Sequence, residues 1–189
     1  MEKLFLTALL MGMSVSGIHA QNATIEPTFS EWHDLQVNAV NRFATHTDFF
    51  AFAPFENLRG TKFDMKKSAN YLSLDGDWKF NWVENADQRP TDFFRTDFDD
   101  SQWKTFPVPG IWEVNGYGDP VYVNIGFAWR GNFKNNPPEV PIKENHVGSY
   151  RRTIRIPDNW DGKQVIAHFG SVTSCVYLWV NGKFVGYSE

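Results

Sequence analysis

The 189-residue sequence predicts an all-β protein, a sandwich of jelly-roll type. Short apolar segments alternate with polar residues at a period of two, turn residues separate them, and no long segment has helical periodicity. The strongest local pattern is residues 177–187, where apolar residues flank Asn181-Gly182. Both turn residues tolerate positive φ, which is typical of a tight primed hairpin turn. Because the second strand runs up to Glu189 with nothing to close the sheet, the predicted sandwich is incomplete at its C-terminal end.

The first 20 residues match the pattern of a signal peptide. A short charged start, residues 1–3, precedes an apolar run over 4–15 that is too short to span a bilayer. Small residues within 17–20 favour cleavage there, so residues 1–20 are predicted to be removed and the mature chain to be exported, either periplasmic or secreted. The alternative is a buried N-terminal helix.

Composition excludes several classes of partner. The formal net charge is −4 and the sequence has no Lys/Arg run, which argues against nucleic acid. No second hydrophobic stretch reaches membrane-spanning length, so no membrane insertion of the mature chain is expected. Aromatic residues make up 16% of the chain and include eight Trp, which suits either sugar recognition or sandwich-core filling. The only cysteine, Cys175, is predicted to be a small buried hydrophobe.

Residues 21–69 are predicted to form an extended N-terminal arm, followed by the truncated jelly-roll domain over 70–189. The arm has no clean period, two interrupting prolines and many phenylalanines, so it is expected to lie against another surface.

Within 70–189, alternation predicts strands at residues 78–82, 149–156 and 164–169. The segment 106–110 contains two prolines and must be extended at a sheet edge, because proline cannot donate to a ladder.

A ligand-binding region is predicted between residues 116 and 141. A short apolar strand, 121–123, ends at Asn124, and a long loop carrying Trp129 follows it. Loops of this length without secondary structure are usually functional. The Asn124 carboxamide has both a donor and an acceptor, which suits a sugar hydroxyl. The alternative is that Asn124 only satisfies loop backbone.

No catalytic or metal-binding residue is predicted. The five histidines lack the clustered or i, i+4 spacing of a metal site. Carboxylates such as Asp75, Asp77, Asp99 and Asp100 lie at turns, where capping is their usual role. Neither a phosphate-binding glycine loop nor a nucleophile elbow occurs.

Several motifs, in order along the chain, resemble the N-terminal sugar-binding jelly roll of glycoside hydrolase family 2, a galactose-binding-like β-sandwich. They are Ser73-Leu74-Asp75-Gly76-Asp77-Trp78, Phe98-Asp99-Asp100-Ser101-Gln102-Trp103, Gly116-Tyr117-Gly118-Asp119-Pro120-Val121-Tyr122-Val123-Asn124, Gly148-Ser149-Tyr150-Arg151-Arg152 and Leu178-Trp179-Val180-Asn181-Gly182. The arm, through Glu31-Trp32-His33-Asp34 and Val40-Asn41-Arg42, is similar to that of the long lacZ-type β-galactosidases.

The resemblance implies the N-terminal part of a retaining β-galactosidase that hydrolyses terminal non-reducing β-D-galactosides. Its two catalytic glutamates, about 5 Å apart, would belong to a barrel domain outside this sequence, so this chain alone is expected to be inactive. Family members bind magnesium and sodium, but no ligand falls in this chain. The arm contributes to oligomer contacts in the family, which allows a homo-oligomer.

Two substrate-binding residues are suggested, one by the resemblance and one by a stretch where this sequence differs from the family pattern. Asn124 closes a Pro-x-Tyr-x-Asn segment whose asparagine reaches the galactose pocket. Residues 125–133 are longer than the usual link, and Trp129 or Phe133 is hypothesised to stack on the aglycone side. The competing interpretations are a stand-alone carbohydrate-binding module, a docking domain, and the related β-glucuronidases and β-mannosidases.

Overall fold

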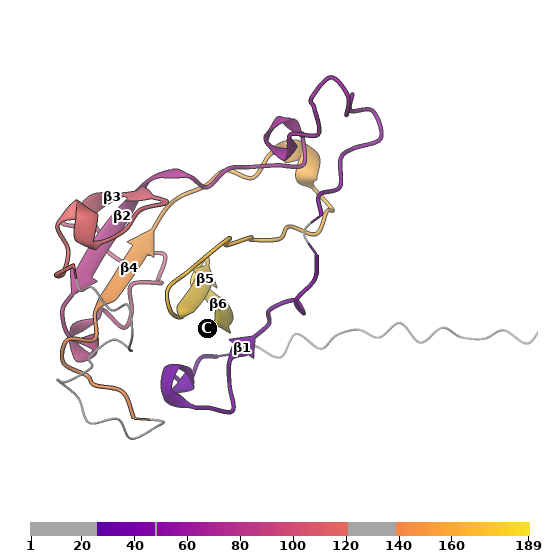
Figure 1. Cartoon of the computed structure of the whole chain (residues 1–189). Coiled ribbons are helices and arrows are strands. Elements are labelled where there is room, and N and C mark those ends of the chain that lie inside the picture. The colour runs from indigo at the N-terminus through magenta and orange to yellow at the C-terminus, as the bar shows by residue number, and fades with distance from the viewer. Residues whose placement is uncertain (1–25, 48, 121–138) are drawn as a thin grey trace, which may run out of the picture.

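The structure is a computed structural model that describes residues 26–47, 49–120 and 139–189 (Figure 1). These residues form two antiparallel three-stranded sheets and contain no α-helix, so the all-β prediction is confirmed. The strands are β1 (Ala39–Val40), β2 (Gly76–Val83), β3 (Lys104–Val108), β4 (Val147–Arg151), β5 (Val176–Val180) and β6 (Lys183–Ser188). Short 3-10 helices are η1 (Glu31–His33), η2 (Met65–Lys67), η3 (Ala86–Gln88), η4 (Glu113–Asn115) and η5 (Asp158–Trp160). The jelly-roll connectivity stays a prediction.

The first sheet has the order β3-β2-β4, with the longest strand at its centre. In this sheet β2 pairs antiparallel with both neighbours, placing Phe80 opposite Tyr150 of β4. Pro107 lies on β3, an edge strand, as its missing N–H requires.

The core of this sheet is an aromatic cluster around Phe80, which is 1% exposed. Its ring centroid lies 4.6 Å from that of Phe106 and 4.7 Å from that of Tyr150. Gly148 makes this packing possible, because a Cβ there would lie 2.8 Å from the Phe80 ring and 2.5 Å from the ring of Trp112. The predicted alternation of β2 therefore buries one face against aromatic rings.

The second sheet has the order β1-β6-β5 and contains the predicted hairpin. Asn181 and Gly182 both have positive φ, 51° and 80°, as a primed turn requires. Tyr187 on the central strand is 2% exposed. Cys175, just before β5, is half-buried, and burial raises the pKa of its thiol.

Part of the arm belongs to this second sheet. The two residues of β1 pair with Ser188 and Tyr187 of β6. Glu31 of η1 is 5% exposed and accepts hydrogen bonds from the Thr28 amide, at 2.7 Å, and the Tyr177 hydroxyl, at 2.9 Å. The arm is thus anchored on the hairpin by backbone pairing and by a buried carboxylate.

Beyond β1 the arm projects away from both sheets and turns back near η5 (Figure 1). The Trp160 indole N–H donates to the Ala69 carbonyl at 2.7 Å, which ties this turn to η5. Phe50 packs against Phe52 and Tyr71. Other arm phenylalanines face solvent, namely Phe43, Phe49, Phe55 and Phe63.

Two predicted strand extents differ from the structure. The strand predicted over 149–156 ends at Arg151, and residues 164–169, predicted as a strand, are extended but unpaired. The sequence pattern is that of a strand, but no described neighbour lies beside residues 164–169 to form a ladder with them.

Candidate functional site

The two predicted substrate-binding residues, Asn124 and Trp129, lie outside the described residues. The structure does describe the chain on either side of them, up to Pro120 and from Glu139 onward. Both flanks are attached to the same end of β2, and this attachment defines the candidate site.

The flank that leads into the segment is fixed by η4 and the turn that ends it. Gly116 adopts the left-handed conformation at the end of η4, with φ of 85°. The Tyr117 amide then donates to the Trp112 carbonyl at 3.0 Å. The Tyr117 ring stands edge-on to Phe80, with ring centroids 4.9 Å apart. This flank is therefore packed onto the aromatic core.

The flank that follows the segment is held by η3 and the residue before it. The Ala86 amide donates to the Ile142 carbonyl at 3.0 Å, and the Glu144 amide donates to Asn85 Oδ1 at 3.0 Å. Asn145 closes the turn by donating its side-chain amide to the Pro141 carbonyl at 2.9 Å. Backbone groups of this flank thus bond directly to the turn that follows β2.

Trp82, near the end of β2, joins the two flanks. Its ring centroid lies 4.9 Å from that of His146 and 6.2 Å from that of Tyr117. Gly118 lies close to the Trp82 and His146 rings, since a Cβ there would lie 3.2 Å from the His146 ring. The ends of the segment that contains Asn124 are therefore brought together on a rigid strand.

This arrangement was not predicted from the sequence. The predicted ligand-binding region begins at residue 116, but no packing role was assigned to Tyr117 and no role at all to His146. The available signal was the clustering of aromatic residues at both ends of a long loop.

Two of the turn carboxylates that the sequence singles out have structural partners. Asp99 Oδ1 accepts from the Ser101 amide at 2.9 Å, and this bond lowers the pKa of Asp99. Asp100 pairs with Arg151 at 2.8 Å, and Arg151 also donates to the Phe93 carbonyl. Asp99 holds a turn, as the sequence predicts, whereas the Asp100 side chain does not cap a turn and instead links this segment to β4 through the ion pair with Arg151.

Among residues 26–47, 49–120 and 139–189, no group of three or more His, Cys, Asp or Glu side chains is placed to hold a metal ion. Burial raises the pKa of Tyr150, whose hydroxyl accepts from the Trp112 indole N–H at 2.5 Å. The described part of the site therefore offers positioning and packing groups.

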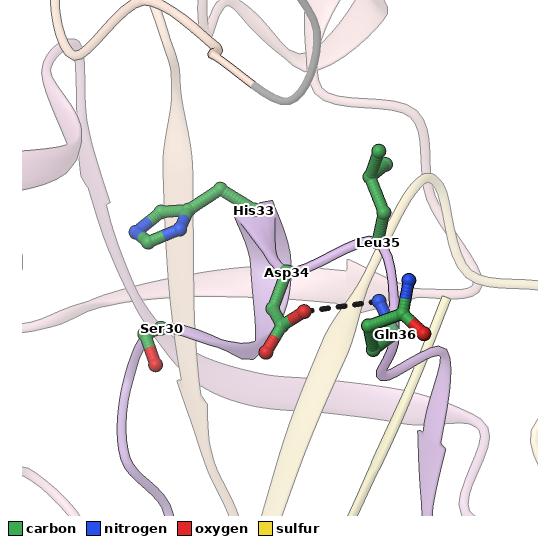
Figure 2. Close-up of a pocket in the computed structure, with 5 residues that line it drawn as sticks. All are labelled: Ser30, His33, Asp34, Leu35 and Gln36. Carbon is green, nitrogen blue, oxygen red and sulfur yellow. Dashed lines mark hydrogen bonds between the residues drawn. The ribbon is translucent and has the colours of Figure 1, made fainter.

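A separate open pocket of about 350 Å³ lies beside η1, lined by Ser30, His33, Asp34, Leu35 and Gln36. Figure 2 shows that these side chains point in different directions, with Asp34 accepting a hydrogen bond from the Gln36 amide at 2.9 Å. Its polar groups do not converge on one point, so it is a poor candidate for binding a sugar.

The described tryptophans do not form an exposed stacking surface. All seven that lie within the described ranges are half-buried, and none is exposed. Trp179, for example, stacks on Phe94 with ring centroids 5.1 Å apart. In the described part of the chain no tryptophan is fully exposed, which weakens the case for a stand-alone module built on exposed Trp.

Comparison with known proteins defines the class. Residues 71–189 match the family model described as glycosyl hydrolases family 2, sugar binding domain. The chain is 37% identical over 162 residues to a β-galactosidase of Priestia megaterium, covering 85% of this chain and 16% of the relative. It is 38% identical over 156 residues to a β-galactosidase of Halalkalibacterium halodurans, covering 82% of this chain and 15% of the relative.

A β-galactosidase large subunit of Leuconostoc lactis is 32% identical over 169 residues, covering 82% of this chain and 26% of the relative. The fold and these matches define a sugar-binding β domain. The chain belongs to glycosyl hydrolase family 2, and it spans only a small part of the length of these relatives.

The prediction of export is wrong, because homologous β-galactosidases are typically cytoplasmic enzymes. The N-terminal residues match a signal peptide in hydropathy, but Glu2 offsets Lys3, so the side chains of the charged start carry no net positive charge. The predicted signal peptide itself lies outside the described residues. No helix in the described ranges is long and apolar enough to cross a membrane.

Proposed function

We propose that this chain is the N-terminal part of a retaining β-galactosidase that hydrolyses terminal non-reducing β-D-galactosides. The observation that carries the proposal is the 37–38% identity to β-galactosidases over more than four fifths of the chain. By the resemblance to the family, the catalytic carboxylates belong to a barrel domain outside this chain.

The chain contributes to the substrate pocket through the segment that contains Asn124. Trp82, Tyr117 and His146 hold the two flanks of this segment at one end of β2. This support favours Asn124 as a galactose contact, with its carboxamide hydrogen-bonding a sugar hydroxyl.

Trp129 is proposed to contact the aglycone, because an aromatic ring packs well on the apolar face of a second sugar. Trp129→Ala should then reduce turnover of an extended galactoside more than turnover of a small aryl galactoside. Equal factors for the two substrates would exclude that role.

The test of the main proposal is kinetic and uses the full-length enzyme. Asn124→Ala should lower kcat/KM for an aryl β-galactoside about 10- to 100-fold, the equivalent of about 1–3 kcal/mol for a lost hydrogen bond. Asn159→Ala is the matched control: Asn159 is exposed and lies in η5, which is not part of either flank, so kcat/KM should stay within about twofold.

Several results would contradict the proposal. Hydrolysis of β-glucuronides or β-mannosides by the full-length enzyme in preference to β-galactosides would point to another branch of the family. Inversion of the anomeric configuration, followed by NMR of the first product, would exclude the retaining mechanism. Tight galactoside binding by the isolated chain in calorimetry would instead favour a binding module.

Magnesium and sodium are proposed as ions of the full-length enzyme only. The described residues offer no cluster of ligands for them, so their sites would lie in other parts of the protein. A homo-oligomer is proposed because four large phenylalanine side chains of the arm face solvent in this chain and a partner subunit would cover them.

A further inference from the structure

Gly118 lies on the flank that leads toward Asn124, against two aromatic rings. Its φ is 74°, a left-handed conformation that favours glycine. A Cβ at this position would lie 3.2 Å from two atoms of the His146 ring and 3.6 Å from the Trp82 ring. Both the backbone and the neighbouring rings therefore select a residue without a side chain here.

The turn conformation alone does not require this contact. Gly116 and Gly162 have similar φ values, 85° and 73°, and a Cβ at either position would meet nothing within 4 Å. Left-handed glycines of this chain can therefore lie in open space. The close approach at Gly118 is a separate feature, and it fixes how near this flank lies to the rings.

The rings against Gly118 are backed by paired strands. Trp82 lies on β2, the central strand of its sheet, in register with Gly148 of β4. His146 directly precedes β4, and its ring centroid lies 4.9 Å from that of Trp82. Because paired strands resist movement, a side chain at Gly118 would displace the flank more readily than the sheet behind the rings.

The Trp82 indole has a property that packing does not explain. Its nitrogen is buried and has no hydrogen-bond partner within residues 26–47, 49–120 and 139–189. A buried donor without a partner is destabilising, and a phenyl ring at this position would avoid that cost. The junction of Trp82, His146 and Gly118 is thus not arranged for stability alone, as is expected where a fold holds a functional segment.

We propose that Gly118 is a positioning residue for the β-galactosidase reaction and that it acts through Asn124. Asn124 follows Gly118 by a few residues, so the contact of this flank with the rings sets where the asparagine segment begins. A shift of about 1 Å in a group that positions the substrate can lower the rate about 100-fold. The inference rests on the proposed function, in which the Asn124 carboxamide bonds a galactose hydroxyl.

The test compares two asparagine substitutions in the full-length enzyme, with an aryl β-galactoside as substrate. Asparagine tolerates positive φ, so each substitution adds a side chain with little backbone strain. Gly118→Asn should raise KM and lower kcat/KM at least ~10-fold, because its side chain meets the His146 ring and displaces the flank. Gly162→Asn is the matched control, since its side chain enters open space, and both constants should stay within about twofold. Equal effects of the two substitutions would overturn the inference.

Two further backgrounds separate positioning from a general loss of structure. In an enzyme that carries His146→Ala the ring is gone, so adding Gly118→Asn should change KM by less than about threefold. In an enzyme that carries Asn124→Ala the further effect should be equally small, because the residue through which Gly118 acts is already lost. An undiminished effect in either background would overturn the inference. So would a lower kcat with an unchanged KM, which is the signature of partial unfolding.

A smaller substitution keeps the test decisive where Gly118→Asn does not fold. Gly118→Ala adds only the Cβ that meets the His146 ring, and Gly162→Ala shares its backbone cost without that contact. KM should be at least ~3-fold higher for Gly118→Ala than for Gly162→Ala. Equal KM values would overturn the inference.

Failure of the proposed function is distinguishable from failure of this inference. A full-length enzyme that prefers another glycoside would contradict the proposed function, and the same variants would then be compared on that glycoside, where the same ratios decide the role of Gly118. An enzyme that hydrolyses β-galactosides equally well with Gly118→Asn and Gly162→Asn would overturn the inference and leave the proposed function standing.

Discussion

The two sheets of this chain each have three antiparallel strands, but they differ in how far apart in sequence those strands lie. The β3-β2-β4 sheet is assembled from residues 76–151, and its aromatic core packs within that range. The β1-β6-β5 sheet takes its third strand from the arm, about 150 residues away in sequence from the strand that it pairs with. The first sheet therefore depends on side-chain packing, and the second also depends on keeping a distant segment in place.

The largest expected effect is on the first sheet. Phe80→Ala removes a fully buried ring from among four other rings and should lower the free energy of unfolding by about 3–5 kcal/mol, measured by urea denaturation. Phe55→Ala, the same substitution at a residue that is 80% exposed, should change it by less than about 0.5 kcal/mol. Similar losses for the two variants would mean that the core does not centre on Phe80.

A smaller effect is expected where the arm is anchored on the second sheet. Burial alone would raise the pKa of Glu31, but hydrogen bonds from Thr28 and Tyr177 outweigh it, and the net pKa is lowered. Glu31→Gln should therefore reduce the free energy of unfolding by about 1–3 kcal/mol at pH 7.

The sign of the pH dependence follows from the lowered pKa. The carboxylate contributes its stability above the ordinary pKa of 4.5 and loses it as the pH falls through the lower folded-state value. The gap between the wild-type chain and Glu31→Gln should accordingly narrow below pH 4.5. Glu26→Gln, at an exposed position on the same arm, should show no such gap. A gap that is constant with pH would show that Glu31 acts through packing alone.

The same contrast between local and distant contacts decides what the sequence could predict. The β2 strand and the hairpin follow from side-chain alternation and from the Asn181-Gly182 pair, because their determinants are adjacent in sequence. The two-residue strand β1 has no local pattern and forms only because β6 offers an edge to it. For residues 164–169 the reverse holds, since their pattern is that of a strand but no described residue pairs with them.

The candidate site divides in a similar way. Asn124 and Trp129 were predicted from a motif and a resemblance, and both lie outside the described residues. The groups that hold the flanks of their segment, Trp82, Tyr117 and His146, were not predicted as a unit. Their association requires β2, η4 and β4 to pack together, and no local spacing in the sequence encodes that packing.

The smallest effect is expected at the turn between β5 and β6. Gly182 has a φ of 80°, a conformation that costs residues with a Cβ about 1–2 kcal/mol, so Gly182→Ala should lower the free energy of unfolding by that amount. Gly170→Ala is the control, because a Cβ at Gly170 would meet nothing within 4 Å and its φ is not left-handed. It should be neutral or slightly stabilising, since alanine restricts the unfolded chain. If Gly182→Ala were as harmless as the control, the hairpin would not limit the stability of the second sheet, and the arm contacts through Glu31 would have to carry it.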